Sequence, residues 1–558
     1  MIRRQDIGYN GMLKGIFLFH PFSLTALLLL SILGMAFSLA TPLIMKSLID
    51  DVLIARNVSL LMPLLLALSG IYIISALAHF FSGYIKGKLD ILLFQDISSR
   101  LLENLHTSSY KEIRKYKTGD LLARTTGNIS STVQIMTTLI PDLIMAVLGF
   151  VLPFIILFSL DARLTLIVMS PIFLFYLSSW YFGRKMKQSQ RIMLDSGAKL
   201  NSVLKEMLTI IPLTKVYGLE TWMLVKFNRQ ISEYNENSLN TVKISSLSSS
   251  AGMLIYGIPS ILVLSFGSLA LLEGRITLGT LTAFMGYVGL FFSPIQQLST
   301  LWTNYKGSQA AFDRIREIMS LEQDRWGEKK IPNPPSTITF EKVSFAYDNQ
   351  TILKDFNATF QTGRNYLIGE NGSGKSTLIN LLSGLYHPDN GKILINGQDI
   401  SEISKDQLNE FVSVVFSDSL IFDGTIEENI QIGNLDATPE IIIQASKKAG
   451  LHSFVASLPQ QYKTEVGESG LNLSSGEKQK IALARVILRD TPVIVFDEFT
   501  RSIDIDSKKS IDAVIKKFDG KIIIIITHNM SEIEEKCNKI CLKKDSYLPI
   551  FSNANCIG

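Results

Sequence analysis

The first ~300 residues of the chain contain six apolar segments, each long enough to cross a lipid bilayer, and this feature limits the fold more than any other. A transmembrane helix needs about 20 consecutive apolar residues. The composition fits a protein that is only partly embedded in lipid, because 47% of its 558 residues are hydrophobic and 19% are charged. The predicted transmembrane helices lie near residues 22–45, 60–84, 138–160, 163–183, 248–272 and 279–302.

The basic residues set the orientation of these helices. The connections between the second and third and between the fourth and fifth segments are long, helix-like and rich in lysine and arginine. The turns after the third and fifth segments are short and carry almost none. Because cytoplasmic loops are enriched in basic residues, the termini and the long connections are predicted in the cytosol. We therefore expect an integral protein of a bacterial inner membrane.

Each long connection is interrupted once, at 110–119 and at 211–222, where glycine and proline supply the turns. Aromatic residues beside charged ones favour a docking surface on another domain, and a solvated loop is the alternative. Within the spans, His79, Gln296 and Gln297 are candidates for a substrate path, and helix packing is the alternative for them.

The composition changes after residue 320. Residues 321–335 are polar and rich in proline, which is typical of a linker. The chain is thus predicted to join an all-α transmembrane domain of six helices with long cytosolic extensions, residues 1–320, to a soluble α/β domain, residues 336–558. The net charge of +4 is small and argues against nucleic acid as a partner.

The soluble part carries a phosphate-binding loop of the P-loop NTPase type, because a glycine-rich segment lies between a strand-like run and a helix-like run. Glycines allow backbone N–H groups to surround an oxyanion, and the helix N-terminus adds positive potential. Lys375 is predicted to reach the β and γ phosphates of ATP, and the Ser376 hydroxyl to bind Mg²⁺. The candidate ATP ligands in this loop are Gly369, Glu370, Asn371, Gly372, Ser373, Gly374, Lys375, Ser376 and Thr377.

Further residues fit the same chemistry. Tyr347 precedes the loop and can stack on adenine through its ring face. A buried strand ends in Asp497, a candidate Mg²⁺ ligand, followed by Glu498, a candidate general base for the attacking water. Another apolar strand is followed by His528, which can bind the γ-phosphate and orient the water.

With these motifs the whole chain resembles the ATP-binding cassette transporters, in particular half-transporters of the exporter type. Leu473–Gln479 looks like the family's signature loop, and the resemblance implies that Ser474 and Gly476 bind the nucleotide held by the opposite subunit. Thr464–Glu468 resembles the exporter-specific loop that responds to the position of the coupling helices. Ser502–Asp504 resembles the loop that links the two ATP sites across the dimer. The two interruptions would be the coupling helices, the second docking on the partner's nucleotide domain.

The sequence departs from the family pattern in the same region. Ser417 stands where a glutamine is expected to contact Mg²⁺, and the signature loop has Ser475 for a glycine and Glu477 for a glutamine. The negative charge of Glu477 is expected to weaken closure over a triphosphate. These departures from the family pattern therefore predict ATP hydrolysis that is slow or that differs between the two sites.

The predicted function is that of an ATPase coupled to transport, which exports an amphipathic peptide, drug or lipid by alternating access. Its predicted partners are a second half-transporter subunit, membrane lipids and the cargo. A homodimer is the simpler expectation, and a heterodimer stays open. The alternatives are a membrane sensor that uses the ATP switch without moving cargo, and an importer with an exporter-like fold.

Overall fold

A computed structural model of the chain describes residues 21–542 except 332, 349, 418, 468, 469, 471, 500–512, 517, 519, 528–532 and 534–536, and within one helix the side chains of 295–297, 299, 300 and 302–304. The chain divides into two compact units. The first comprises Met1–Leu102 and Gly119–Met319, and the second comprises Glu103–Thr118 and Ser320–Gly558. Gln296 and Gln297 are thus outside the described side chains.

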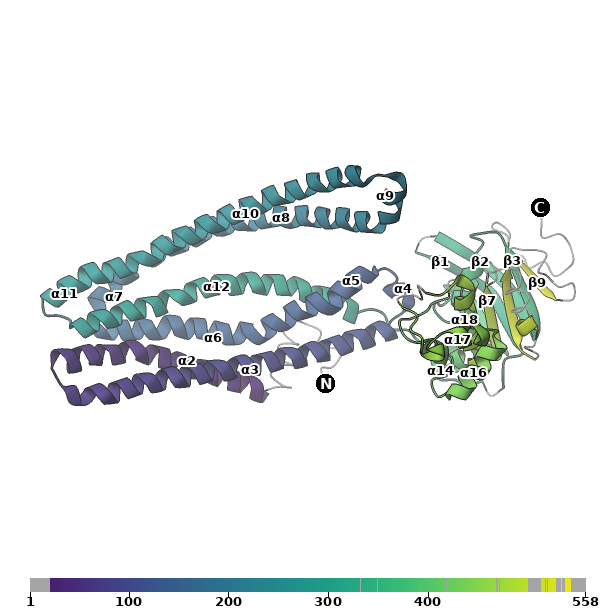
Figure 1. Cartoon of the computed structure of the whole chain (residues 1–558), viewed down its shortest axis with the longest axis horizontal. Helices are drawn as coiled ribbons and strands as arrows, with labels where there is room; N and C mark the ends of the chain where they lie inside the picture. Colours follow the sequence, from purple (N-terminus) through teal and green to yellow (C-terminus); the bar gives the residue numbers. More distant parts are fainter. Residues whose placement is uncertain are drawn as a thin grey trace. The chain divides into compact units, whose positions relative to one another are not determined.

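The first unit is built from long helices (Figure 1). Short helices and turns connect them, among them α5 (Thr118–Ala123), α7 (Ala162–Met169), α9 (Ile211–Tyr217) and α11 (Ser268–Leu272). The long helices are α2 (Pro21–Ser47), α3 (Leu61–Thr107), α6 (Ile129–Leu160), α8 (Ile172–Thr209), α10 (Glu220–Leu262) and α12 (Leu278–Met319).

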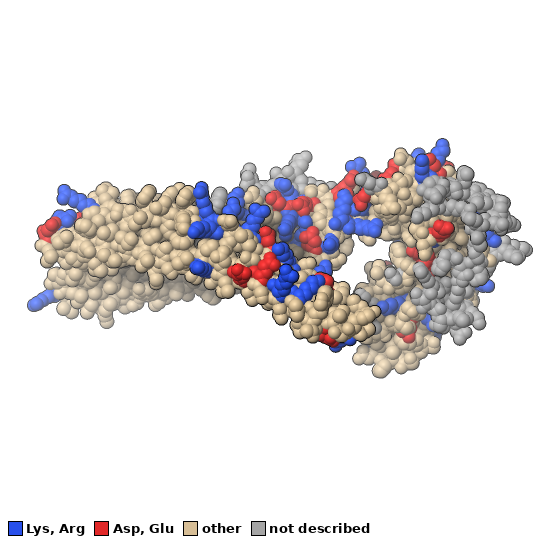
Figure 2. Space-filling view, turned by 90° about the horizontal axis from the view of Figure 1, so that it is seen from above, with Lys and Arg blue, Asp and Glu red and all other residues tan. Residues whose placement is uncertain are grey.

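Among the described residues, five helical stretches are long and apolar enough to cross a membrane. The sixth predicted span falls on α12, whose apolar part, Leu278–Pro294, is shorter. On the face shown in Figure 2, a broad region of this unit carries no charged side chain, which is what contact with lipid requires. The five stretches are Pro21–Ile54, Val58–Thr107, Thr118–Leu160, Ala162–Thr209 and Glu220–Leu272.

The core of the first unit lies along α12. This helix runs beside α6 and α2, while α8 and α10 pair with each other (Figure 1). Four aromatic side chains of α12 are buried and pack against α2, α6 and α7. Close packing of this kind holds helices together where lipid offers no hydrophobic driving force. The four are Phe284, Tyr287, Phe291 and Phe292.

The second unit contains two β-sheets. The antiparallel sheet has the order β2-β1-β4-β5, with β1 at Thr337–Tyr347, β2 at Gln350–Gln361, β4 at Asn390–Ile395 and β5 at Gln398–Asp399. The parallel sheet has the order β6-β7-β8-β3-β9, with β6 at Val412–Val415, β7 at Val493–Asp497, β8 at Ile522–Thr527, β3 at Gly363–Gly369 and β9 at Asn538–Leu542. Its central strands are almost continuous runs of buried Val and Ile, as expected when both faces of a sheet are covered.

Helices pack against these sheets, and α18 forms a second core with its neighbouring helices and with residues of β6, β7 and β8. The segment Glu103–Thr118, with the short helix α4 (Tyr110–Ile113), packs as part of this second unit although it lies far away in sequence. The other helices are α13 (Lys375–Leu382), α14 (Lys405–Phe411), α15 (Ile426–Gln431), α16 (Pro439–Lys448), α17 (His452–Ser457) and α18 (Ser475–Arg489).

Candidate functional site

The glycine-rich loop connects the end of β3 at Gly369 to the start of α13 at Lys375. Gly372 and Gly374 adopt φ angles of 80° and 101°, in the left-handed region that L side chains rarely adopt. A Cβ atom on Gly374 would also lie 3.0 Å from the Leu353 side chain. The loop conformation thus depends on glycine, and it leaves the first N–H groups of α13 directed at an anion site.

The Lys375 side chain is buried in this loop. Its ammonium donates hydrogen bonds to the carbonyl oxygens of Gly369, at 2.7 Å, and Glu370, at 2.8 Å. Burial lowers the pKa of Lys375, and the nearby charges of Glu498 and Asp497 partly offset this effect. The hydrogen bonds of this ammonium go to neutral carbonyl oxygens, so a bound phosphate would add a negative charge in direct contact with it.

Three neighbouring parallel strands end beside the phosphate loop, and Glu498 directly follows one of them. β3, β8 and β7 are neighbours, with Ile368 opposite Thr527 and Asp497 opposite Ile526. Their carboxyl ends therefore meet beside the loop, which is the usual place for a ligand in a sheet of this type. His528 follows Thr527 in the chain and itself lies outside the described residues.

Asp497 and Glu498 form an acidic pair at the end of β7. Burial, together with repulsion from Glu498, raises the pKa of Asp497 from 3.8 to about 6, and attraction to Lys375 opposes this. Glu498 has a φ of 45°, and its N–H donates to the Ile526 carbonyl oxygen at 3.3 Å. Such strained backbone in a non-glycine residue is concentrated at functional sites.

The residues present fit a magnesium ion that is held together with a nucleotide. A hydroxyl from Ser376 and a carboxylate from Asp497 are oxygen ligands of the kind Mg²⁺ prefers. Among the described residues, no group of three His, Cys, Asp or Glu side chains could hold a metal alone. An ion at this site would therefore need phosphate oxygens to complete its coordination, as is usual for Mg²⁺.

Tyr347, at the end of β1, is fixed by its neighbours. Its hydroxyl accepts a hydrogen bond from Asn380 Nδ2 on α13, at 3.3 Å. Its ring lies nearly perpendicular to those of Phe345 and Tyr386, with centroid distances of 4.9 and 5.3 Å. The predicted adenine-stacking residue is thus tied to the helix that begins in the phosphate loop.

Ser474 and Gly476 lie on a different element, at the start of α18. The Ser474 hydroxyl accepts a hydrogen bond from the N–H of Glu477, at 3.3 Å, and the Glu477 carboxylate accepts one from the N–H of Ser474, at 2.7 Å. This is a capping box, in which the Ser474 hydroxyl acts as a hydrogen-bond acceptor. The departure at Glu477 therefore has a local structural role.

Other predicted loop residues are placed only in part. Ser417 is exposed just after β6. Glu468 and Ser502–Asp504 lie outside the described residues.

Sequence reasoning pointed to 110–119 as a docking surface but did not identify its target. Arg114 lies over the ring of Tyr347, with its guanidinium carbon 5.1 Å from the ring centroid, and its Nη1 donates to the Tyr386 hydroxyl at 3.4 Å. Lys111 pairs with Asp389 at 4.0 Å. The mixture of aromatic and charged residues was the available signal, and it does not specify which residues meet.

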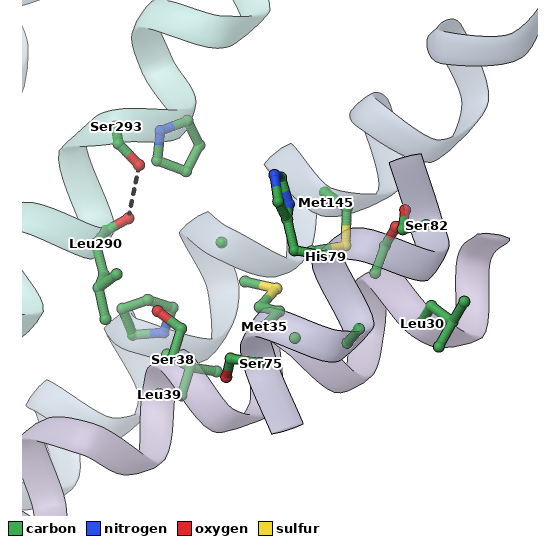
Figure 3. Close-up of a pocket in the computed structure, with 16 residues that line it drawn as sticks. Leu30, Met35, Ser38, Leu39, Ser75, His79, Ser82, Met145, Leu290 and Ser293 are labelled. Atoms are coloured by element: carbon green, nitrogen blue, oxygen red, sulfur yellow. Dashed lines mark hydrogen bonds between the residues drawn. The ribbon is translucent and has the colours of Figure 1, made fainter. Parts of the chain in front are cut away.

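The first unit contains a pocket of about 480 Å³ among α2, α3, α6 and α12 (Figure 3). Its lining is mostly apolar, and its polar side chains are His79 and five serines. No lysine, arginine, aspartate or glutamate is among the lining residues. The serines are Ser31, Ser38, Ser75, Ser82 and Ser293.

Two family models match the chain. The model described as the ABC transporter transmembrane region matches residues 24–295, and the model described as ABC transporter matches residues 353–501. Together they cover most of both units.

Individual proteins align along nearly the whole chain. An uncharacterized ABC transporter ATP-binding protein of Bacillus subtilis, YfiC, is 28% identical over 93% of this chain and 87% of its own length. An ATP-dependent lipid A-core flippase of Syntrophus aciditrophicus is 26% identical over 90% of this chain and 84% of its own. A solved bacterial Atm1-family ABC exporter with ATP bound has the same fold, with a TM-score of 0.79, 22% identity and 94% coverage of both chains.

Proposed function

Because the chain belongs to the ATP-binding cassette transporters, we propose that it is one half of an exporter whose two copies close on two ATP molecules to move an amphipathic cargo. It is an integral membrane protein with a cytosolic nucleotide-binding unit, and it couples ATP hydrolysis to transport. Relatives named as a putative multidrug exporter and a lipid A-core flippase favour export over import or a cargo-free sensor.

The hydrolytic part of this proposal rests on one observation. The carboxyl ends of the neighbouring strands β3, β8 and β7 lie together beside the phosphate loop. Lys375 and the loop N–H groups hold the β and γ phosphates, and Tyr347 stacks on adenine. Mg²⁺, held by Ser376 and Asp497, would neutralise charge on the phosphates. Glu498 takes a proton from the attacking water, which adds to the γ-phosphorus as ADP leaves.

The remaining roles involve a second subunit, and we propose that this is another copy of the same chain. His528 orients the water within one copy, while Ser474 and Gly476 bind the γ-phosphate held by the other copy. The short helix α9 supports such a partner, since Val216 and Tyr217 are 80% and 69% exposed. Apolar side chains this exposed at a helix tip favour burial against another protein surface.

We place the cargo in the pocket of Figure 3. Its volume, about 480 Å³, lies within the range of small-molecule sites. The serine hydroxyls and the imidazole of His79 can both donate and accept hydrogen bonds, and none of the lining side chains is an acid, lysine or arginine. The pocket therefore suits an uncharged amphiphile with hydrogen-bonding groups, such as a hydrophobic peptide with blocked ends.

The hydrolytic roles are tested with Glu498→Gln in full-length protein reconstituted into vesicles. We expect ATPase activity to fall by about 10²- to 10⁴-fold while ATP stays bound in a closed dimer. Glu410→Gln, an exposed change of the same chemistry on α14, is the control and should behave like the unaltered protein. Normal turnover in Glu498→Gln would refute the role of general base.

The subunit and cargo proposals have separate tests. The purified chain alone should hydrolyse ATP, and no turnover without a second, different subunit would refute the homodimer. N-acetylated hydrophobic peptide amides should stimulate turnover more than the same peptides carrying one lysine or glutamate. His79→Leu should reduce this stimulation, whereas His106→Leu, on the same helix and outside the pocket, should not. Equal stimulation by charged peptides would refute the cargo class.

A further inference from the structure

The contact between Arg114 and Tyr347 joins two segments with different roles. Arg114 directly follows α4, and its guanidinium covers one face of the Tyr347 ring at 5.1 Å from the centroid. Its Nη1 also donates to the Tyr386 hydroxyl, and the Tyr110 ring packs edge-on against Tyr386 with centroids 5.6 Å apart. The segment Glu103–Thr118 is thereby attached to the aromatic cluster that contains Tyr347.

This cluster holds the Tyr347 ring in one orientation. Tyr386 is only 3% exposed, and its ring is nearly perpendicular to that of Tyr347. The Asn380 amide donates to the Tyr347 hydroxyl, and Asp389 accepts the backbone N–H of Ala346, the preceding residue, at 2.8 Å. The ring is therefore held through its hydroxyl, through ring contacts with Phe345 and Tyr386, and through the backbone of the preceding residue.

The Arg114 guanidinium lies over one face of the Tyr347 ring. A purine that stacks on Tyr347 while this contact persists would use the opposite face. An aromatic ring can bind a cation on one side and a second ring on the other. Adenine and Arg114 would then act on the same ring without competing for space.

We propose that Arg114 is a positioning residue for nucleotide binding: it holds the Tyr347 ring ready for adenine, so that base occupancy and the attachment of Glu103–Thr118 strengthen each other. The inference rests on the proposed role of Tyr347 as the adenine-stacking residue. A ring that is already ordered loses less freedom when a ligand binds, which improves affinity. Coupling between two binding events is reciprocal, so bound adenine must tighten the hold on the segment by the same factor.

The expected size of the effect follows from the contact. The interaction of a cation with an exposed aromatic ring corresponds to a change in affinity of about two- to fivefold. Arg114→Met should weaken ADP binding by that factor and leave pyrophosphate binding unchanged, because pyrophosphate has no base to stack. Lys115→Gln removes a positive charge from the next residue, whose ammonium pairs with Glu112, and should change neither affinity.

A double-mutant cycle in the full-length chain, in lipid nanodiscs, tests the inference. Calorimetric titration with ADP and with pyrophosphate is run on the unaltered chain, Arg114→Met, Tyr347→Ala and the double variant, since neither ligand is hydrolysed. We expect Arg114→Met to have no further effect once Tyr347 is alanine. Arg114→Lys should recover part of the lost ADP affinity because it keeps the charge but not the planar group.

Hydrogen exchange supplies an independent measurement of the reciprocal effect. ADP should slow the exchange of amides in Glu103–Thr118 in the unaltered chain, pyrophosphate should do so less, and Arg114→Met should abolish the difference. Additive effects in the cycle, or equal losses for ADP and pyrophosphate, would overturn the inference. If Tyr347→Ala itself leaves ADP affinity unchanged, the adenine-stacking role fails, and that outcome is distinct from a failure of Arg114.

Discussion

Replacing Asp497 with asparagine should remove a large part of the pH dependence of nucleotide binding between pH 5 and pH 7. Burial and the charge of Glu498 raise the pKa of Asp497 to about 6 in the nucleotide-free protein. Below that pH the carboxyl group is mostly protonated, whereas the proposed role of Asp497 as a Mg²⁺ ligand requires the carboxylate. Protons therefore compete with the magnesium nucleotide at Asp497.

The size of this competition can be worked out from the pKa. A group with a pKa of about 6 is half ionised at pH 6 and about one-tenth ionised at pH 5. Affinity for magnesium ADP should therefore fall about twofold at pH 6 and about tenfold at pH 5, relative to pH 8. Asp497→Asn binds more weakly at every pH but lacks this component.

The assay is titration of magnesium ADP into the full-length chain and the Asp497→Asn variant at a series of pH values. The nucleotide phosphates also titrate, so the difference between the two curves isolates Asp497. Glu498→Gln removes the neighbouring negative charge, which should lower the pKa of Asp497 and move the midpoint to lower pH. Parallel curves for the unaltered chain and Asp497→Asn would refute the reasoning.

The same pKa makes a prediction about stability without nucleotide. The pKa of Asp497 is raised in the folded state, so its contribution to stability is present below about pH 4 and is lost as the pH rises through about 6. A shift of the pKa from 3.8 to about 6 corresponds to a loss of roughly 3 kcal/mol in the free energy of unfolding at neutral pH. Asp497→Asn should raise the unfolding temperature of the nucleotide-free chain at pH 7.5, and no change would contradict the burial argument.

Two further predictions concern contacts outside the phosphate loop. Glu477→Gln keeps an acceptor for the Ser474 N–H but removes a negative charge, so ATP affinity should rise with little change in unfolding temperature. Glu477→Ala breaks the capping box and should lower the free energy of unfolding by about 0.5–2 kcal/mol. If Glu477→Gln left ATP affinity unchanged, the charge of Glu477 would not weaken nucleotide binding. Arg124 is nearly buried and pairs with Glu317 at 2.7 Å, so Arg124→Met should destabilise the first unit by about 1–3 kcal/mol, measured by thermal unfolding. Arg316→Met, at a half-exposed side chain, is the control and should change stability by less than about 0.5 kcal/mol.

The phosphate loop could be predicted because its signal is local. A strand, a glycine-rich turn and a helix start occupy one short stretch, and the backbone angles of Gly372 and Gly374 explain why glycine is needed there. The acidic pair after β7 is equally local, since a buried apolar run ends directly in Asp497. The sequence could not show that burial raises the pKa of this carboxyl, because that depends on how the surrounding strands pack.

The contacts of Arg114 could not be predicted in the same way. Arg114 and Tyr386 are 272 positions apart, and no periodic pattern connects them. Composition identified a docking segment at 110–119, but only the structure shows that its target includes Tyr347.

Of the residues that line the membrane pocket, sequence reasoning singled out only His79 as a candidate for a substrate path. Ser75, His79 and Ser82 lie on one face of α3 at helical spacing, but isolated small polar residues in a span are equally consistent with helix packing. Only the pocket shows that this face of α3 meets the polar side chains of α2 and α12.

The capping box at the start of α18 affects the inference, drawn from the altered signature loop, about whether the second subunit is the same chain. An acidic residue at Glu477 suggests a weakened site and therefore a different partner that supplies a stronger one. The Glu477 carboxylate, however, accepts the Ser474 N–H at 2.7 Å, so its charge also stabilises the start of α18. The Ser474 hydroxyl accepts the Glu477 N–H, so its own O–H group is not used in the capping box. The contact gives Glu477 a role within a single chain, and this supports the proposed homodimer over a pairing with a different subunit.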